Sequence, residues 1–263
     1  MKIRFTGNVP VEHEDIMRNV EFARQSGLPY VKPSEAHDRV LAIVGGGPSL
    51  LGSLEELKAF QGDIWAVNGA CAFLRTHGID STMIGVDPHV IMCQWAPGTK
   101  KAILCSRTDY RVWPILKDAD VQLFDLIQEN TDEGIRSGSS TATCAFDLAT
   151  DMGYRTIIFY GCESSFPGEQ IGTASDQTHA YCKEVREHRM LVECGGAEYL
   201  TAPDFFVQAT EIASMIKEFP THFSERCGGL LRALVQNDDY DIIKVSRAMM
   251  ATLELPKPEL EAA

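Results

Sequence analysis

The sequence predicts an α/β protein built on a mainly parallel sheet with helices on both faces. Short apolar runs with the length and composition of buried strands alternate with segments of helical periodicity along most of the chain. The first of these runs, residues 39–44, stops at the three consecutive glycines 45–47. Because parallel neighbouring strands need a crossover that is usually a helix, this alternation predicts a parallel sheet.

The first part of the chain is expected to form a helix and then strands and short helices in turn. Residues 12–25 carry apolar side chains at helical spacing, and Gly27-Leu28-Pro29 ends the run. Ser53 and Glu56 have the spacing of a capping box, so a short helix should begin there and end at Gly62. Strands are expected at residues 39–44, 63–68, 81–87, 101–105 and 121–124, with a helix that ends at 76–78.

The second part of the chain is expected to be mainly helical after one more strand. Small residues at 137–141 should open a helix that ends at Gly153, and a buried strand should follow at 155–161. Residues 163–178 are polar and lack periodicity, and a loop of this length is usually functional, so we expect a lid. Further helices are expected at 179–194, at 205–219 and after Gly228-Gly229, and the tail 255–263 should fray.

The composition fits one large domain and excludes some classes of partner. The chain has 263 residues, of which 44% are hydrophobic and 23% charged, and its net charge is −13. Such an acidic chain lacks the basic surface that tracks phosphates, so we expect no nucleic-acid partner. The eight cysteines are scattered without a C-x-x-C pair and should be reduced core residues. No apolar run has the length of a membrane span, and we expect a cytoplasmic protein with no membrane partner.

The three glycines predict a turn that suits an anion. Without Cβ atoms, Gly45, Gly46 and Gly47 let several backbone N–H groups converge on one point. Pro48 suits the first turn of a following helix, whose N-terminus is partly positive. The motif lacks the Lys-Ser/Thr of a Walker A loop, and Leu50 replaces the last glycine of a G-x-G-x-x-G fingerprint. The alternative is a tight structural turn without a ligand.

Four of the predicted strands stop at polar or flexible residues, at the edge of a parallel sheet where ligands bind. Asp87, after the third strand, could hold a divalent ion or a ribose hydroxyl, or it could form an Asx turn before Pro88. His179 follows the polar loop and could act as a general base or contact phosphate, or it could be a surface histidine at a helix start. The four strand ends are Gly45-Gly46-Gly47, Asn68-Gly69, Asp87-Pro88-His89 and Cys162-Glu163.

Four motifs taken together resemble those of the 6-hydroxymethylpterin diphosphokinase MptE-like family, which is similar to the motility accessory factor (Maf) proteins. The resemblance covers residues 39–179 and implies a Rossmann-like fold with magnesium-dependent transfer of a diphosphate from ATP to a hydroxymethyl group. The motifs are Gly45-Gly46-Gly47-Pro48-Ser49-Leu50, Gly85-Val86-Asp87-Pro88-His89, Ser137-Gly138-Ser139-Ser140-Thr141 and Gly161-Cys162-Glu163.

The same order of motifs also resembles bacterial sialyltransferases that use a CMP-activated sugar. In those enzymes a G-N-G-P-S-L loop, an Asn, an N-P step, an S-G helix start and a His build the nucleotide site. This chain has Gly46 and Asp87 in place of two asparagines, and Asp87 favours a metal-assisted reaction on a phosphoanhydride. The matching positions are Gly45 to Leu50, Asn68, Asp87-Pro88, Ser137-Gly138 and His179.

These resemblances leave three functions open. The first is a diphosphotransferase, in which the amides of Gly46, Gly47 and Ser49 cradle phosphates while Asp87 orients Mg²⁺. The second is a glycosyltransferase in which His179 activates an acceptor hydroxyl, and the third is a nucleotide-binding protein without turnover. The predicted catalytic residues are Asp87, which is also the predicted metal ligand, and His179. The residues predicted to bind nucleotide or phosphate are Gly45, Gly46, Gly47, Pro48, Ser49, Asn68, Ser137, Gly138, Ser139, Ser140 and Glu163.

The expected partners are a nucleotide, either ATP or a CMP-sugar, and a small-molecule acceptor. The sequence leaves the acceptor and the oligomeric state open, because acceptor specificity would lie in loops without diagnostic chemistry. The chain is expected to divide into an N-terminal helical arm at 1–38, a Rossmann-like nucleotide-binding domain at 39–235 that includes the lid, and a C-terminal extension at 236–263.

Overall fold

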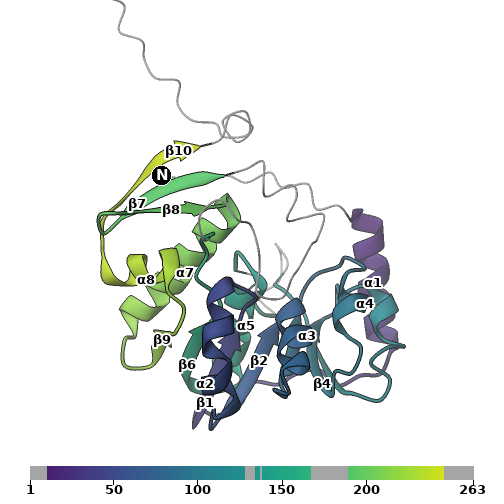
Figure 1. Cartoon of the computed structure of the whole chain (residues 1–263). Helices are drawn as coiled ribbons and strands as arrows, with labels where there is room; N and C mark the ends of the chain where they lie inside the picture. The colour runs from purple at the N-terminus through teal and green to yellow at the C-terminus, as the bar shows by residue number, and fades with distance from the viewer. Residues whose placement is uncertain (1–10, 128–133, 137, 167–188, 246–263) are drawn as a thin grey trace, which may run out of the picture.

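The computed structural model of this protein describes residues 11–127, 134–136, 138–166 and 189–245 (Figure 1). Its main sheet has seven strands, and every strand pair recorded in it is parallel. This confirms the predicted parallel sheet. Across the sheet the strands are β5 (Asp120–Phe124), β4 (Lys101–Cys105), β3 (Thr82–Gly85), β2 (Asp63–Val67), β1 (His37–Val44), β6 (Tyr154–Tyr160) and β9 (Phe223–Glu225).

Helices cover both faces of this sheet, as predicted. The described helices are α1 (His13–Gln25), α2 (Leu54–Lys58), α3 (Gly69–Thr76), α4 (Met92–Trp95), α5 (Thr141–Asp151), α7 (Pro203–Glu218) and α8 (Gly229–Gln236), with 3₁₀ turns η1 (Pro48–Ser53) and η2 (Tyr110–Val112). One core cluster joins the sheet to α5, α7 and α8, and the other joins it to α1, α2, α3 and α4. No helix in the described parts of the chain is long and apolar enough to cross a bilayer.

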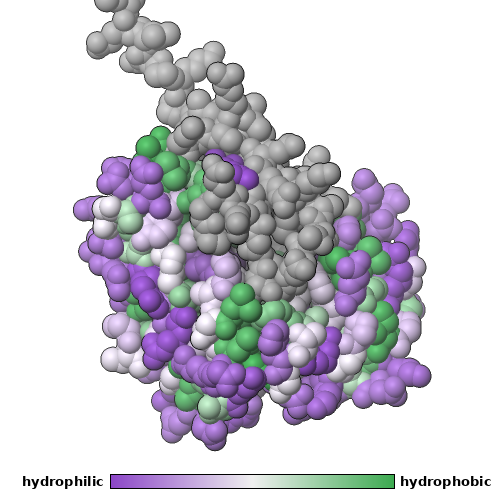
Figure 2. Space-filling view, viewed as in Figure 1, coloured by the Kyte–Doolittle hydropathy of each residue, from purple (hydrophilic) through white to green (hydrophobic). Residues whose placement is uncertain are grey.

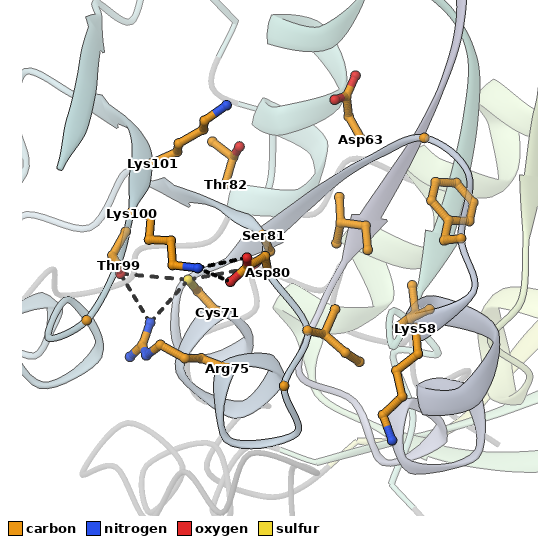
Figure 3. A pocket seen from close by; sticks show the side chains of 17 residues that line it. Lys58, Asp63, Cys71, Arg75, Asp80, Ser81, Thr82, Thr99, Lys100 and Lys101 are labelled. Carbon is orange, nitrogen blue, oxygen red and sulfur yellow. Dashed lines mark hydrogen bonds and ion pairs between the residues drawn. The ribbon is translucent and has the colours of Figure 1, made fainter.

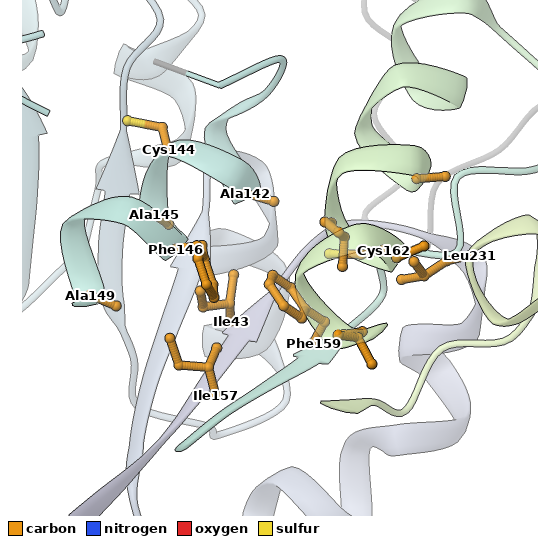
Figure 4. Packing of buried hydrophobic residues seen from close by; sticks show 14 of the residues in the cluster. Ile43, Ala142, Cys144, Ala145, Phe146, Ala149, Ile157, Phe159, Cys162 and Leu231 are labelled. Atoms are coloured by element: carbon orange, nitrogen blue, oxygen red, sulfur yellow. The ribbon is translucent and has the colours of Figure 1, made fainter. Parts of the chain in front are cut away.

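Strand β1 explains why the sheet needs both layers of helices. Its last four residues, 41–44, are fully buried. Leu41 and Ile43 belong to the cluster under α5, whereas Ala42 and Val44 belong to the opposite cluster, because successive side chains of a strand point to opposite faces. Figure 4 shows Ile43 packed among Phe146 of α5 and Ile157 and Phe159 of β6. The apolar run in the sequence is therefore the central strand of the protein.

A second, three-stranded sheet corrects the prediction for residues 179–194. Strands β7 (Met190–Cys194), β8 (Ala197–Thr201) and β10 (Tyr240–Val245) pair antiparallel in the order β10-β7-β8. The expected helix is wrong at 190–194, where Met190, Val192 and Cys194 are buried in alternation, and residues 179–188 lie outside the described chain. Gly195 and Gly196, with φ of 62° and 76°, form the turn that joins β7 to β8.

The small sheet also shows that the C-terminal part is not helical throughout. It lies at one end of the molecule, with α7 and α8 next to it (Figure 1). Its strand β10 comes from the stretch predicted as a C-terminal extension, and it pairs with β7. At the other end of the chain, Val31 donates its N–H to Leu123 of β5 at 2.8 Å, so the predicted arm is hydrogen-bonded to the edge of the main sheet.

The capping box predicted at Ser53 does not form. Pro48 begins the 3₁₀ turn η1 directly after the glycines, so the chain is already helical when it reaches Ser53. Ser53 has φ −101° and ψ 0°, whereas an N-cap needs an extended backbone, and its hydroxyl donates to Ser49 O at 3.5 Å. The helix predicted after the small residues does form, because Ser140 caps α5 by accepting the N–H of Thr143.

The surface seen in Figure 2 is mainly hydrophilic and most of the described cysteines are buried, as the composition and the positions of the cysteines in the sequence predict. On the face seen in Figure 2, hydrophilic residues surround several small apolar patches, which is usual for a folded chain. All the cysteines in the described ranges are free, as predicted, and burial raises the pKa of the Cys105 thiol to about 11 and of the Cys144 thiol to about 12. Five of them are buried, namely Cys71, Cys105, Cys144, Cys162 and Cys194.

Candidate functional site

The order of the strands defines where a ligand of this sheet should bind. The chain builds β1 to β5 outward in one direction and then returns to place β6 on the other side of β1. The connections after β1 and β6 therefore leave in opposite directions and open a crevice at the carboxyl ends of these strands. A cavity of about 150 Å³ lies there, lined by Gly45, Gly46, Gly47, Pro48, Val67, Asn68, Ala142, Gly161, Cys162, Glu163, Ser164, Ser165, Phe166, Phe205 and Gln208.

The glycine turn and the end of β6 approach each other more closely than side chains would allow. Gly45 donates its N–H to Tyr160 O, and Gly47 donates to Gly161 O, each at 2.8 Å. A Cβ on Gly45 would lie 2.5 Å from Gly161 O and 2.8 Å from Cys162 Sγ, and a Cβ on Gly161 would overlap Gly45 O. Gly161 also has a φ of 61°, which favours glycine. These glycines thus allow the backbones after β1 and β6 to lie in direct contact.

A buried carboxylate occupies the turn that was predicted to cradle phosphates. Glu163 is 4% exposed, and its Oε1 accepts the N–H of Ser49 at 2.6 Å while its Oε2 accepts the Ser49 hydroxyl at 2.8 Å. A Cβ on Gly47 would overlap this carboxylate. The amides of Gly47 and Ser49 therefore already donate to acceptors of the protein. Glu163 is also the only Asp, Glu, Lys, Arg or His among the described residues that line the cavity.

The loop before α5 holds a second carboxylate. Ser139 donates both its N–H and its hydroxyl to Glu211 Oε2 of α7, at 3.0 and 2.6 Å. Gly138 has a φ of 56° and packs on Thr143, while Ser137 lies outside the described residues. Each of the two stretches predicted to bind an anion thus contacts a carboxylate from elsewhere in the chain. Sequence reasoning did not find Glu211, since nothing in the spacing of α7 links it to Ser139.

Backbone strain is concentrated at this cavity. Two non-glycine residues of the described chain have positive φ, Asn68 at 50° and Ser164 at 55°, and both line the cavity. Such conformations cost about 1–3 kcal/mol and cluster at functional sites. Asn68 donates its Nδ2 to Thr141 Oγ1 at 3.2 Å, while its buried Oδ1 has no partner within the described structure. An unpaired buried acceptor beside a cavity marks a place where a ligand could donate a hydrogen bond.

Two aromatic rings and an amide complete the lining of the cavity, and no motif in the sequence pointed to them. Phe166 and Phe205 lie with their ring centroids 5.6 Å apart, and Gln208 donates its Nε2 to Ser164 Oγ at 2.8 Å. Phe205 and Gln208 are three positions apart on α7 and so face the same side of the helix. The two rings give the cavity an apolar part of its lining.

The predicted lid can be described only at its first residues. Glu163 and Ser164 are buried, Phe166 donates its N–H to Leu200 O at 2.8 Å, and Thr201 donates its hydroxyl to Ser164 O at 2.6 Å. Residues 163–166 are therefore packed against β8, so a lid would begin after Phe166. Residues 167–178 and the predicted base His179 lie outside the described residues.

Asp87 stands apart from this cavity. Its Oδ1 accepts the N–H of His89 at 2.9 Å, which is the Asx turn weighed as its alternative role. Strand β3 is two places from β1 in the sheet, or about 10 Å at the usual strand spacing. Where the structure describes the chain, no group of three or more His, Cys, Asp or Glu side chains is placed to hold a metal. The magnesium site at Asp87 stays a prediction.

The residues after Asp87 line a different cavity of about 310 Å³, between α1 and the loop after β4. Pro88 and His89 face Asp109 and Arg111 there, and Arg111 donates to the Asp109 carboxylate through its Nε at 2.9 Å and its Nη2 at 2.6 Å. Burial pushes the pKa of Asp109 upward, but the hydrogen bonds and the charge of Arg111 outweigh it and hold the pKa below its usual value. Asp109 is thus an ionised structural partner of Arg111.

A larger cavity of about 500 Å³ lies at the opposite edge of the sheet (Figure 3). Its lining includes Asp63, Thr82 and Lys101, which begin β2, β3 and β4. Arg75 points its Nη1 at Thr99 Oγ1, 3.2 Å away, and Lys100 forms an exposed ion pair with Asp80. Ligands of open parallel sheets bind at the carboxyl ends of the strands, so this groove is at the wrong edge for the predicted site.

Comparison with known proteins identifies the family to which this chain belongs. A family model described as 6-hydroxymethylpterin diphosphokinase MptE-like matches residues 14–169, which is more than half of the chain. The chain belongs to the MptE-like family. The match extends from α1 through the glycine turn and Asn68 to Glu163, whereas α7, α8 and the small sheet of this MptE-like protein lie outside it.

A solved structure supports the fold of the MptE-like chain. It is titled "Structure of MAf glycosyltransferase from Magnetospirillum magneticum AMB-1", and its TM-score to this chain is 0.62 with 15% identical residues. The alignment covers 82% of the MptE-like chain but only 36% of the Maf chain, so our chain spans about a third of that protein. A search of curated proteins finds no match. The likeness confirms the α/β fold.

Proposed function

We propose that this MptE-like protein is a nucleotide-dependent transferase that binds its nucleotide in the crevice between β1 and β6. The proposal rests chiefly on the cavity at this point, where the two strained residues Asn68 and Ser164 meet the glycine turn. The buried and unpaired Oδ1 of Asn68 offers a hydrogen-bond acceptor to a ligand. Membership of a family named for a diphosphokinase supports a transferase that acts on nucleotides.

The reaction we favour is the transfer of a diphosphate from ATP to a hydroxymethyl acceptor. The acceptor hydroxyl oxygen attacks the β-phosphorus and its proton passes to solvent, while the bond from the β-phosphorus to the oxygen shared with the α-phosphate breaks and AMP leaves with that oxygen. Such a transfer depends on positioning and charge neutralisation, which a divalent ion supplies when bound. Asp87 fits this role only in part, since its Oδ1 is used by His89 and, among the described residues, only Oδ2 has no recorded partner and could bind a metal. Mg²⁺ is often held by a single carboxylate with substrate phosphates.

A second candidate function is glycosyl transfer from a CMP-activated sugar. Its support is the order of motifs shared with sialyltransferases, together with the fold shared with the Maf glycosyltransferase over 82% of this chain. In this reaction the acceptor oxygen attacks the anomeric carbon of the sugar, its proton passes to a base, and CMP leaves. His179 is the residue we propose as that base.

We expect nucleotide to raise the melting temperature of the wild type, and Asn68→Gly to weaken that binding about tenfold. Glycine accepts the positive φ of residue 68, so the variant should fold, but it lacks the amide that faces the ligand. A lost hydrogen bond to a buried group costs about 1–3 kcal/mol, and 1.4 kcal/mol is a factor of ten. Titration calorimetry with ATP and with a CMP-sugar would measure the change. Equal affinity of variant and wild type would place the nucleotide elsewhere.

Product analysis separates the two reactions. Incubation with ATP and an alcohol acceptor should release AMP, whereas incubation with a CMP-sugar should release CMP. We expect Asp87→Asn to lower AMP release at least tenfold, while nucleotide affinity without Mg²⁺ stays unchanged, because the amide keeps the Asx turn but loses the charge that holds the cation. If Asp87→Asn releases AMP at the wild-type rate at every Mg²⁺ concentration, Asp87 has only its structural role.

A further inference from the structure

The charge of the cavity bears on which part of a nucleotide enters it. Among the described residues, no Lys, Arg or His lines it, and its one charged side chain is the buried Glu163. Within this described lining, a phosphate would therefore meet a carboxylate without a cation between them, and like charges in a poorly hydrated site repel strongly. The glycine turn offsets little of this repulsion, because two of the three amides predicted to cradle phosphates, Ser49 N–H and Gly47 N–H, are already used by Glu163 and Gly161.

The same carboxylate is well suited to neutral donors. Two carboxylate oxygens provide about four acceptor positions, and Ser49 fills one on each oxygen. The remaining acceptors suit a pair of hydroxyl groups on adjacent carbons, which can donate one hydrogen bond to each oxygen. An acidic residue at the carboxyl edge of a nucleotide-binding sheet commonly binds ribose in this way. Asn68 Oδ1, buried and unpaired beside the same cavity, accepts hydrogen bonds only, as Glu163 does.

We infer that Glu163 binds the vicinal diol of the ribose and keeps the phosphates of the nucleotide outside the cavity. This inference rests on the proposed function, since it assumes that a nucleotide binds in this crevice. It gives Glu163 a role in specificity: the site distinguishes ribonucleotides from sugars without a diol, and the phosphate chain points away from the glycine turn.

The first experiment uses the wild type alone. Adenosine, cytidine, AMP and CMP are titrated beside their 2′,3′-dideoxy analogues by calorimetry. We expect removal of the diol to weaken binding at least about tenfold, because two hydrogen bonds to a charged group are lost. Addition of the phosphate should change the affinity by a much smaller factor than removal of the diol. Equal binding of the ribose and dideoxy forms would overturn the inference.

The second experiment repeats the titrations with Glu163→Gln and with the matched variant Glu211→Gln, whose carboxylate also accepts from a serine but does not line the cavity. In Glu163→Gln the penalty for the dideoxy analogue should shrink to less than about twofold, since half of the acceptors are replaced by donors. In Glu211→Gln the penalty should equal that of the wild type. Circular dichroism melting curves check that both variants fold. If a variant does not fold, the titrations of the wild type still test the inference.

Two other outcomes separate this inference from the function on which it rests. If Glu163→Gln binds AMP and CMP more tightly while nucleosides bind as before, the phosphate competes with Glu163 for the glycine turn, and the inference is overturned while the nucleotide site stands. If the wild type binds none of the nucleosides or nucleotides at millimolar concentration, the proposed function is itself overturned, and the inference with it.

Discussion

Gly161→Ala should lower the free energy of unfolding by about 2–5 kcal/mol, the sum of two penalties. Residue 161 has a φ of 61°, where a Cβ costs about 1–2 kcal/mol. The new Cβ would also overlap Gly45 O. A clash with rigid backbone of this kind costs about 1–3 kcal/mol more. Urea unfolding followed by circular dichroism measures the change. The same displacement should open the crevice and weaken nucleotide binding.

Gly196→Ala is the matched control for this variant. Residue 196 also has positive φ, at 76°, but no atom lies within 4 Å of the position of its Cβ. It should therefore cost only the backbone penalty of about 1–2 kcal/mol and leave nucleotide binding unchanged. The difference between the two variants isolates the contact between the strand ends. If both variants lose the same free energy of unfolding, the overlap of the new Cβ with Gly45 O does not lower stability.

Phe159→Ala should cost about 3–5 kcal/mol, because it empties a large volume at the centre of the core. The Phe159 side chain is fully buried in β6 and stacks on Phe146 of α5 with ring centroids 6.1 Å apart (Figure 4). Phe219→Ala is the control of the same residue type, since Phe219 is 48% exposed, and it should cost less than about 1 kcal/mol. If the two variants lost the same free energy of unfolding, α5 and its neighbours would have relaxed into the space left by the Phe159 ring.

The central strands, and a cavity at their carboxyl ends, were predictable from the sequence because their signals are local. The apolar run 39–44 can be buried on both faces only at the centre of a parallel sheet, and the structure has it there. The small residues before Thr141 likewise predict the helix that Ser140 caps. Asn68 was found because it directly follows a strand, although its strained backbone was not foreseen.

The remaining features depend on contacts between distant parts of the chain. The helix predicted at 190–194 is wrong, because the alternating burial of strand β7 arises from its pairing with β8 and β10, which lie elsewhere in the sequence. The carboxylates that contact Ser49 and Ser139 come from residues far away in sequence, and no spacing rule joins them. The prediction that these stretches bind phosphate assumed that the N–H groups at their helix ends are free. In the structure, the carboxylates of Glu163 and Glu211 accept hydrogen bonds from these stretches.

The close approach of Gly45 and Gly161 also limits how this protein can evolve. Most tight contacts in a core can be relieved by a second mutation that shortens the partner side chain. Here each partner is already a glycine, and the atoms in contact belong to the backbone. A larger residue at either position therefore has no compensating substitution at the other. We expect these two positions to stay fixed in descendants of this chain, or to change only when the relative placement of the two strands changes as well.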